Sequence, residues 1–134
     1  EVRGTVRTLS TATRTAIFRR LEEIAAGVGR QHGATVEFVL EDGYPVTVND
    51  AARADFAAEV AAGVVGTASV DAATPPMMGG EDFSFMLEAR PGAFVFIGNG
   101  DSAGLHHPAY DFNDAIIPAG VSFWVHLAER ALPA

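Results

Sequence analysis

Two adjacent histidines stand out in the stretch GLHHPAYDFNDAIIP, residues 104 to 118. His106 and His107 precede a proline that stiffens the loop, and the chain holds only four histidines. Neutral imidazole is the commonest side-chain metal ligand, and Asp111 or Asp114 could orient it. The pair indicates either a metal ligand in a rigid loop or a polar surface turn. The second interpretation stays open because a metal site normally needs roughly three or four ligands, and this pair supplies only one or two.

A second group of residues lies in MMGGEDFS, residues 77 to 84. Gly79 and Gly80 let the backbone approach a ligand closely and can point amides at an anion. Glu81 and Asp82 follow at the start of an expected short helix. The stretch therefore predicts either a turn that lines a cleft or merely favourable charges in the first turn of a helix.

Arg7 lies in GTVRT, on the first expected strand. A guanidinium group recognises a carboxylate through a bidentate fork, so an arginine that faces a cleft could anchor a substrate. Most arginines on strands simply face solvent, and that alternative stays open here. We interpret His32, at the end of a helix, and His126, inside the last helix, as structural residues.

The first elements that must position these residues follow from the apolar pattern of residues 1–42. Alternation and β-branched side chains predict strands over residues 2–9 and 35–40. Between them, apolar residues at spacings of three and four predict a helix that begins after Ser10 or Thr11 and ends at Gly33. Strand, helix and strand form a parallel crossover, but two strands alone make a marginal sheet. We therefore expect another segment to complete it.

Further elements are expected over the rest of the chain. A connection ends in a helix N-cap at Asn49 or Asp50, and the alanine-rich helix that follows stops near Gly66. A short helix is predicted over residues 83–89. The apolar run AFVFIG predicts a buried strand, and Pro118 suits the first turn of a closing helix. That helix is expected to bury four side chains, Val121, Trp124, Val125 and Ala128.

The composition favours a soluble globular chain. Of 134 residues, 49% are hydrophobic and 19% charged, which excludes a disordered composition. No apolar run approaches the roughly 18 residues that cross a bilayer. A net charge of −8 without any lysine argues against nucleic-acid or anionic-membrane partners. The absence of cysteine excludes disulfides and thiolate metal sites and is compatible with the cytoplasmic location that we expect.

In combination, five motifs resemble a known family: GTVRT, GYPVTVND, MGGEDFS, GNG and LHHPAYDFND, in this order. Together they look like the C-terminal third of a metal-dependent amidohydrolase of the hippurate hydrolase and N-acyl-amino-acid amidohydrolase family. This family is similar to auxin-conjugate hydrolases and, more distantly, to glutamate carboxypeptidases. The resemblance covers essentially the whole chain.

This resemblance implies an α/β fold with two domains. The family has a catalytic domain that holds two divalent metal ions, such as zinc or manganese, and a ferredoxin-like lid that also forms a dimer interface. Residues 1–43 match the second half of the lid, and residues 44–134 match the hinge and the C-terminal segment of the catalytic domain. The missing strand of the lid sheet lies upstream in relatives.

The resemblance also implies roles for single residues. His106 matches a metal ligand, Arg7 matches a lid arginine that contacts the substrate carboxylate, and Gly79 and Gly80 match a turn that lines the cleft. We assign no role to Glu81, Asp82 or His107 and no catalytic residue in this chain. In relatives the glutamate base and the remaining metal ligands lie upstream of the matched region.

We therefore expect a fragment of an amidohydrolase that acts on N-acyl amino acids and is inactive alone. The expected partners are this small-molecule substrate and a second copy bound through the lid region. One alternative is a small binding or dimerisation protein that descends from the same fold. Another keeps the enzyme but changes its substrate to a dipeptide or a carbamoyl amino acid.

Overall fold

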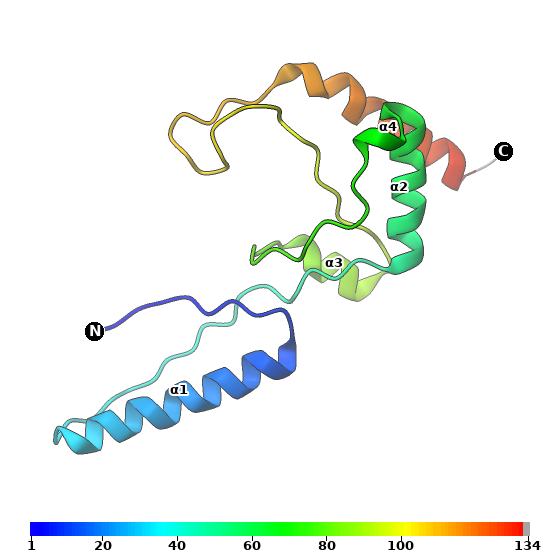
Figure 1. The fold of residues 1–134 in the computed structure, drawn as a ribbon. Coiled ribbons are helices and arrows are strands. Elements are labelled where there is room, and N and C mark those ends of the chain that lie inside the picture. The colour runs from blue at the N-terminus through cyan, green and yellow to red at the C-terminus, as the bar shows by residue number, and fades with distance from the viewer. Residues whose placement is uncertain (133–134) are drawn as a thin grey trace. The chain divides into compact units, whose positions relative to one another are not determined.

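The computed structural model describes residues 1–132, and within them the regular structure is entirely helical (Figure 1). Four α-helices alternate with long irregular segments: α1 (Thr11–Gln31), α2 (Ala51–Val65), α3 (Phe83–Ala89) and α4 (Ile117–Ala131). Two short 3₁₀ turns are η1 (Thr67–Ser69) and η2 (Asp114–Ile116). Within the described residues, no helix is both long enough and apolar enough to cross a membrane.

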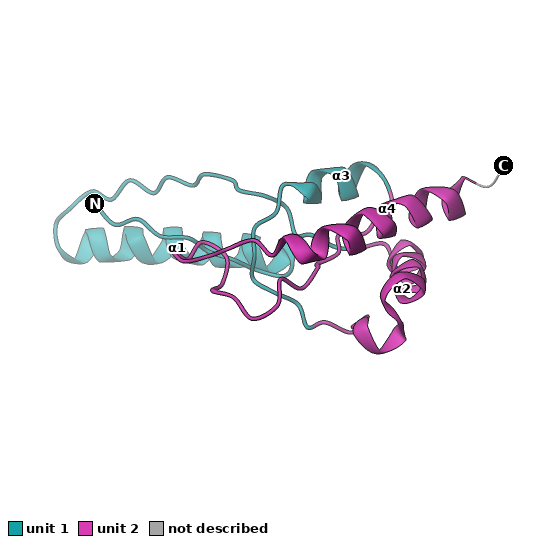
Figure 2. Cartoon of the chain, turned by 90° about the horizontal axis from the view of Figure 1, so that it is seen from above, with its two compact units in different colours: residues 1–48, 75–90 teal, residues 49–74, 91–134 magenta. Residues whose placement is uncertain are grey.

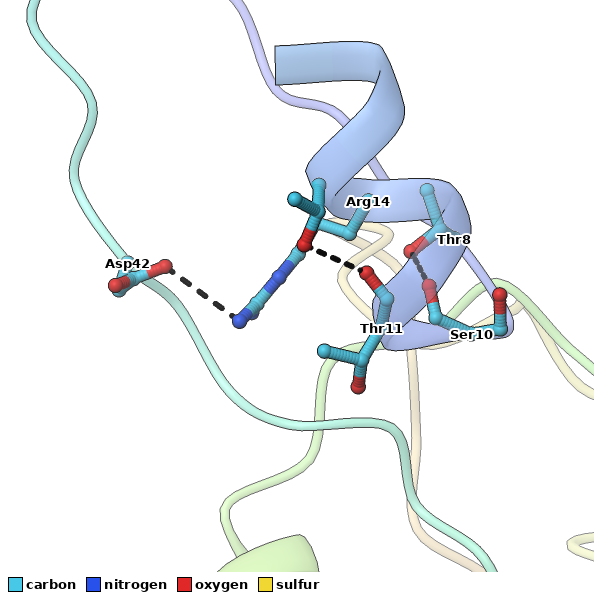
Figure 3. Close-up of polar contacts among 6 residues, drawn as sticks. Thr8, Ser10, Thr11, Arg14 and Asp42 are labelled. Carbon is cyan, nitrogen blue, oxygen red and sulfur yellow. Dashed lines mark hydrogen bonds and ion pairs between the residues drawn. The ribbon is translucent and has the colours of Figure 1, made fainter. Parts of the chain in front are cut away.

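The boundaries of α1 follow from capping chemistry. The Ser10 hydroxyl accepts a hydrogen bond from the Thr13 amide at 3.1 Å. The Thr8 hydroxyl donates to the Ser10 carbonyl (Figure 3). Figure 3 also shows Arg14 reaching the Asp42 carboxylate, 3.7 Å away, in the segment that follows the helix. Gly33 takes a left-handed φ of 64° just past the end. The predicted first helix and both of its ends are therefore confirmed.

The other helices also begin where the local sequence predicts, and α2 and α3 end there as well. The Asp50 carboxylate accepts from the Arg53 amide at 3.0 Å and caps α2, and Gly66 ends that helix at a φ of 84°. Helix α3 has the predicted bounds. Pro118 lies in the first turn of α4, where its missing amide proton is not needed.

The predicted strands are not formed. None of the described residues belongs to a strand, and no backbone hydrogen bond among them joins residues 2–9 or 35–40 to another extended segment. Both segments instead run as irregular chain beside α1 (Figure 1). An extended segment becomes a strand only when a neighbour pairs with its amides and carbonyls. The predicted α/β fold is thus not confirmed, because the described residues form the predicted helices but none of the predicted strands.

The chain divides into two compact units, coloured separately in Figure 2. Unit 1 contains residues 1–48 and 75–90, and unit 2 contains residues 49–74 and 91–134. This division reflects contacts inside the chain. The predicted boundary near residue 43 concerns which domain of the relatives each segment matches, and it stays a prediction.

Burial inside each unit is slight. In unit 1, Gly29 is buried because α1 packs closely on residues 34–36, and Ser84 is fully buried at the start of α3. In unit 2, Ala57 and Val60 are buried on α2, the helix that contacts α4.

An ion pair and a cation–π contact support the α2–α4 packing. The Arg130 guanidinium lies 3.1 Å from the Glu59 carboxylate and 5.4 Å from the centre of the Phe56 ring. Both partners of Arg130 belong to α2, so this one side chain links the last turn of α4 to two positions of the neighbouring helix.

Several apolar residues expected in a core are exposed instead. The run AFVFIG is not a buried strand, since Phe96 is 65% exposed, and on α4 the Trp124 side chain is 63% exposed. On α1, Ile24 and Val28 are about half exposed. The side chains on α1 and α4 belong to the apolar faces that helical periodicity predicts. An apolar face is buried only where another segment covers it. Within each unit, the described residues contain too few segments that pack against these faces.

Candidate functional site

The loop that carries both histidines is closed at its base by two asparagines of unit 2. The Asn99 side chain accepts a hydrogen bond from the Asn113 amide at 2.8 Å and donates to the Asp111 carbonyl at 2.8 Å. It also donates to the Ser102 hydroxyl at 2.8 Å, and the Asn113 side chain donates back to the Asn99 carbonyl at 3.3 Å. Residues 99 and 113, fourteen positions apart, are thereby held together.

His106 lies near the tip of this loop in an uncommon backbone conformation. Its φ is 66°, in the left-handed region that residues with a Cβ rarely occupy. The side chain is exposed, and among the described residues neither ring nitrogen has a hydrogen-bond partner. The His106 imidazole is therefore free to donate a lone pair to a ligand.

His107 is engaged in the turn itself. Its Nδ1 accepts a hydrogen bond from the Ala109 amide at 3.1 Å, its amide donates to Gly104, and its carbonyl accepts from Tyr110. When Nδ1 of a neutral imidazole accepts, the proton resides on Nε2, which leaves no free lone pair for a metal. The two adjacent histidines therefore differ: His107 shapes the loop, and His106 is available.

The described residues do not gather a metal-binding cluster by themselves. They contain no group of three or more histidine, cysteine, aspartate or glutamate side chains close enough to hold a metal ion. The suggested orienting role of Asp111 or Asp114 is also not observed, because no hydrogen bond of the described residues joins either carboxylate to a histidine ring. His106 is available as a single donor.

In unit 1, Arg7 and Gly80 lie close together. A Cβ built on Gly80 would lie 3.2 Å from Nη1 of Arg7 and 3.4 Å from Cδ2 of Tyr44. The Tyr44 ring also meets Phe85 edge to face, with 6.0 Å between ring centres. The Arg7 guanidinium thus sits directly over the backbone at Gly80, beside an aromatic wall.

Arg7 is also unpaired. No described carboxylate forms an ion pair with its exposed side chain, whereas Arg3 on the same segment pairs with Glu1 at 2.6 Å. An unpaired guanidinium beside an exposed glycine backbone can bind a carboxylate by donating two parallel hydrogen bonds to its oxygens.

Gly79 and the acidic pair have simpler surroundings. Nothing lies within 4 Å of a Cβ placed on Gly79, so this glycine is open to solvent. The Glu81 carboxylate accepts from the Phe83 amide at 3.3 Å, and its carbonyl accepts from the Ser84 hydroxyl at 2.6 Å. Glu81 therefore organises the first turn of α3, which supports the interpretation of MMGGEDFS as a helix start. Asp82 is exposed at the position before α3.

A hollow of about 280 Å³ lies elsewhere in unit 1. Its walls come from the start of α1, from the segment before α2 and from α3: Leu9, Ser10, Thr11, Val46, Val48, Ser84, Leu87 and Glu88. None of the predicted site residues lines it, and its lining carries one carboxylate and no cationic group. It is a poor match for an anionic substrate group.

Three residues with clear structural roles were not assigned one from sequence. Asn99 lies in the GNG motif, directly after the predicted last strand, and the motif contributes only to the family resemblance. Tyr44 lies in GYPVTVND and was read only as part of a hinge. Ser84 carried no signal, because its burial depends on where α3 packs.

The chain matches known proteins along nearly its whole length. A model of peptidase family M20/M25/M40 matches residues 7–130, and the chain belongs to this family. It is 29% identical over 131 residues to hippurate hydrolase of Campylobacter jejuni, and 33% identical over 128 residues to N-acetylcysteine deacetylase of Bacillus subtilis. It is also 33% identical over 138 aligned positions to IAA-amino acid hydrolase ILR1-like 4 of Arabidopsis thaliana.

These matches cover most of this chain and a minor part of each relative. They include 98%, 96% and 96% of the chain but 34%, 33% and 31% of the three relatives. The chain therefore spans about a third of the length of the relatives it matches. No solved structure matches the chain significantly. The predicted family is confirmed, and the three relatives are named as two hydrolases and a deacetylase.

Proposed function

We propose that this chain acts as the C-terminal third of a metal-dependent amidohydrolase that cleaves N-acyl amino acids, and that it is inactive by itself. The family match over residues 7–130 carries the proposal. The names of the three relatives above share one chemical pattern, an acyl group removed from an amino acid. Such a substrate carries an amide to be hydrolysed and a carboxylate to be recognised.

Arg7 and Gly80 are suited to the carboxylate. The Arg7 guanidinium has no ion-pair partner among the described residues and lies over the backbone of Gly80. Two parallel N–H donors would grip the two oxygens of a carboxylate, and the lack of a side chain at Gly80 leaves room for it. In this proposal Gly79 and Gly80 line the cleft, and Arg7 orients the substrate.

His106 is suited to hold one of two divalent ions, zinc or manganese. Its ring nitrogens are free, whereas His107 is tied to the turn. When bound, such ions polarise the amide carbonyl and lower the pKa of a water molecule. The other ligands and the glutamate base come, in this proposal, from residues upstream of the matched region. One imidazole is too few for tight metal binding, which is why we expect the isolated chain to be inactive.

The lid assignment and the homodimer are part of the same proposal. Residues 1–43 would form half of a ferredoxin-like lid, and residues 44–134 would form the hinge and the C-terminal segment of the catalytic domain. Residues 2–9 and 35–40 precede and follow α1 in the chain, and no backbone hydrogen bond of the described residues joins them. This supports a lid in which a strand from elsewhere lies between them. A dipeptide or carbamoyl amino acid would satisfy the same carboxylate site.

A non-catalytic binding or dimerisation protein is the second candidate. The exposed apolar face of α1 favours it, because such faces promote association. Against it stands the availability of Arg7 and His106, which a purely structural descendant would not need.

The proposal is tested by comparing the full-length protein that contains this sequence with the 134-residue chain alone. Amide hydrolysis and metal binding are measured for both. Each is assayed with hippurate and N-acetyl amino acids in the presence of zinc or manganese. We expect turnover only from the full-length protein. Turnover by the isolated chain would contradict its proposed inactivity, and no amide hydrolysis by either would refute the function.

Arg7→Ala in the full-length protein tests the carboxylate anchor. The loss of a charged hydrogen-bonded pair, about 1.5–3 kcal/mol, should raise KM roughly 10- to 100-fold for substrates with a free carboxylate. The matched control is Arg3→Ala, on the same segment, whose guanidinium pairs with Glu1. Equal KM values for the two variants would remove Arg7 from the site.

A further inference from the structure

The loop that carries His106 depends on Asn99 for its attachment to the rest of unit 2. Among the described residues, no hydrogen bond joins residues 100–112 to any part of the chain outside residues 99–113. The Asn99 side chain supplies three of the bonds that close the base. We propose that Asn99 is a positioning residue for His106, acting through the loop that it closes. This inference rests on the proposed role of His106 as a metal ligand.

The chemistry at the base requires an amide side chain. Oδ1 of Asn99 accepts a hydrogen bond from the backbone amide of Asn113, while Nδ2 of Asn99 donates to the backbone carbonyl of Asp111 and to the Ser102 hydroxyl. One group must therefore both donate and accept at a short reach from the backbone, which asparagine does and aspartate does not. Aspartate would place a carboxylate oxygen against the Asp111 carbonyl.

The backbone next to Asn99 is fitted to the same arrangement. Gly100 has a φ of 81°, and a Cβ there would lie 3.4 Å from Nδ2 of Asn113. The loop thus leaves its base in a left-handed conformation and adopts a second one at His106. A non-glycine residue persists in that region only when its surroundings hold it there. The turn at His107 secures the tip, and Asn99 secures the base.

The chain offers a matched control in Asn49. This residue also belongs to unit 2, accepts from the Phe94 amide at 2.8 Å and donates to the Phe94 carbonyl at 2.9 Å. It bridges two segments through its side-chain amide as Asn99 does, but no hydrogen bond among the described residues joins its side chain to the histidine loop. Asn49→Ala therefore removes a similar clamp from the same unit.

Three variants of the full-length protein, Asn99→Ala, Asn99→Asp and Asn49→Ala, test the proposal. Deuterium exchange of residues 100–112 and the dissociation constant for zinc alone are measured for each. We expect both Asn99 variants to exchange about tenfold faster in the loop, the equivalent of roughly one net hydrogen bond. Zinc should bind about 10- to 100-fold more weakly, as when a residue behind a metal ligand is lost. Asn49→Ala should leave both quantities near wild type.

Asn99 variants that match Asn49→Ala in loop exchange and zinc affinity would overturn the proposal. Asn99→Asp keeps the size of the side chain, so it separates a lost donor from a failure to fold. A wild-type protein that binds no zinc and cleaves no amide would refute the proposed function instead. The loop-exchange comparison would then still decide whether Asn99 positions His106.

Discussion

At the scale of single residues, two identical side chains next to each other have different chemistry. His107 accepts a backbone hydrogen bond at Nδ1, while the His106 ring is free and its backbone is left-handed. The sequence predicted a ligand at His106 through resemblance, and the pattern His-His-Pro left the polar turn open. In the structure His107 stabilises the turn, because the backbone amide of Ala109 donates a hydrogen bond to its ring. No such bond engages the His106 ring among the described residues, so His106 is available to a ligand.

A substitution at Gly80 should displace the Arg7 guanidinium without greatly changing the stability of the fold. In Gly80→Ala the new methyl would crowd Nη1 of Arg7 at 3.2 Å, and the flexible guanidinium would move away at little cost to folding. We expect KM for carboxylate substrates of the full-length protein to rise about tenfold, roughly the loss of one charged hydrogen bond, with kcat nearly unchanged.

Gly4→Ala provides the control for that experiment, since nothing lies within 4 Å of a Cβ at this position on the same segment. Steady-state kinetics of the two variants, beside thermal unfolding, give the comparison. A Gly80→Ala protein with unchanged KM would show that the guanidinium position does not matter for substrate binding.

At the scale of elements, helix ends were predictable and strands were not. Capping by Ser10 and Asp50, and termination at Gly33 and Gly66, depend on residues within a few positions of one another. Strand formation depends on a partner segment that can be far away in the chain. The alternating residues 35–40 therefore stay irregular, although their pattern favours extended backbone.

Two glycines of α1 should respond to alanine in opposite directions. At Gly29 a Cβ would lie 2.8 Å from the Ala34 carbonyl and 3.0 Å from Cγ2 of Val36, so Gly29→Ala must push residues 34–36 away. At Gly27 the nearest atom, of the Arg30 side chain, is 3.8 Å away, so Gly27→Ala gains about 0.8–1 kcal/mol of helix propensity.

The free energy of unfolding of both variants is measured in the full-length protein by chemical denaturation, followed by circular dichroism. We expect Gly27→Ala to be stabilised and Gly29→Ala to be destabilised by roughly 1–3 kcal/mol, the usual cost of overpacking. Stabilisation of both variants would mean that α1 does not pack on residues 34–36.

At the scale of the whole molecule, apolar surface is left exposed in both units. Leu21, Ile24 and Val28 form a stripe on α1, and Trp124 and Val125 are exposed on α4. Exposed apolar patches of this kind usually mark a surface that another chain or segment covers. The proposal of a C-terminal third gives these faces a partner in the upstream part of the enzyme.

Isolated, the chain should show the consequence of these uncovered faces. We expect it either to dimerise through residues 1–42 or to leave that segment unprotected from hydrogen exchange. Sedimentation velocity at several concentrations, combined with deuterium exchange, measures both. Ile24→Glu should weaken any dimer, because it places a charge on the apolar stripe, whereas Ala26→Glu on the same helix is the control. A monomer with residues 1–42 well protected would contradict the expectation.

The sequence by itself determined the helix boundaries, the family and the residues that could carry chemistry. These depend on local caps, on apolar periodicity and on motifs such as MGGEDFS and LHHPAYDFND. Only the tertiary structure decided that Arg7 lies over Gly80, that Asn99 closes the histidine loop and that the apolar faces stay uncovered. Such contacts join residues far apart in the chain, and their energy depends on geometry that no local pattern encodes.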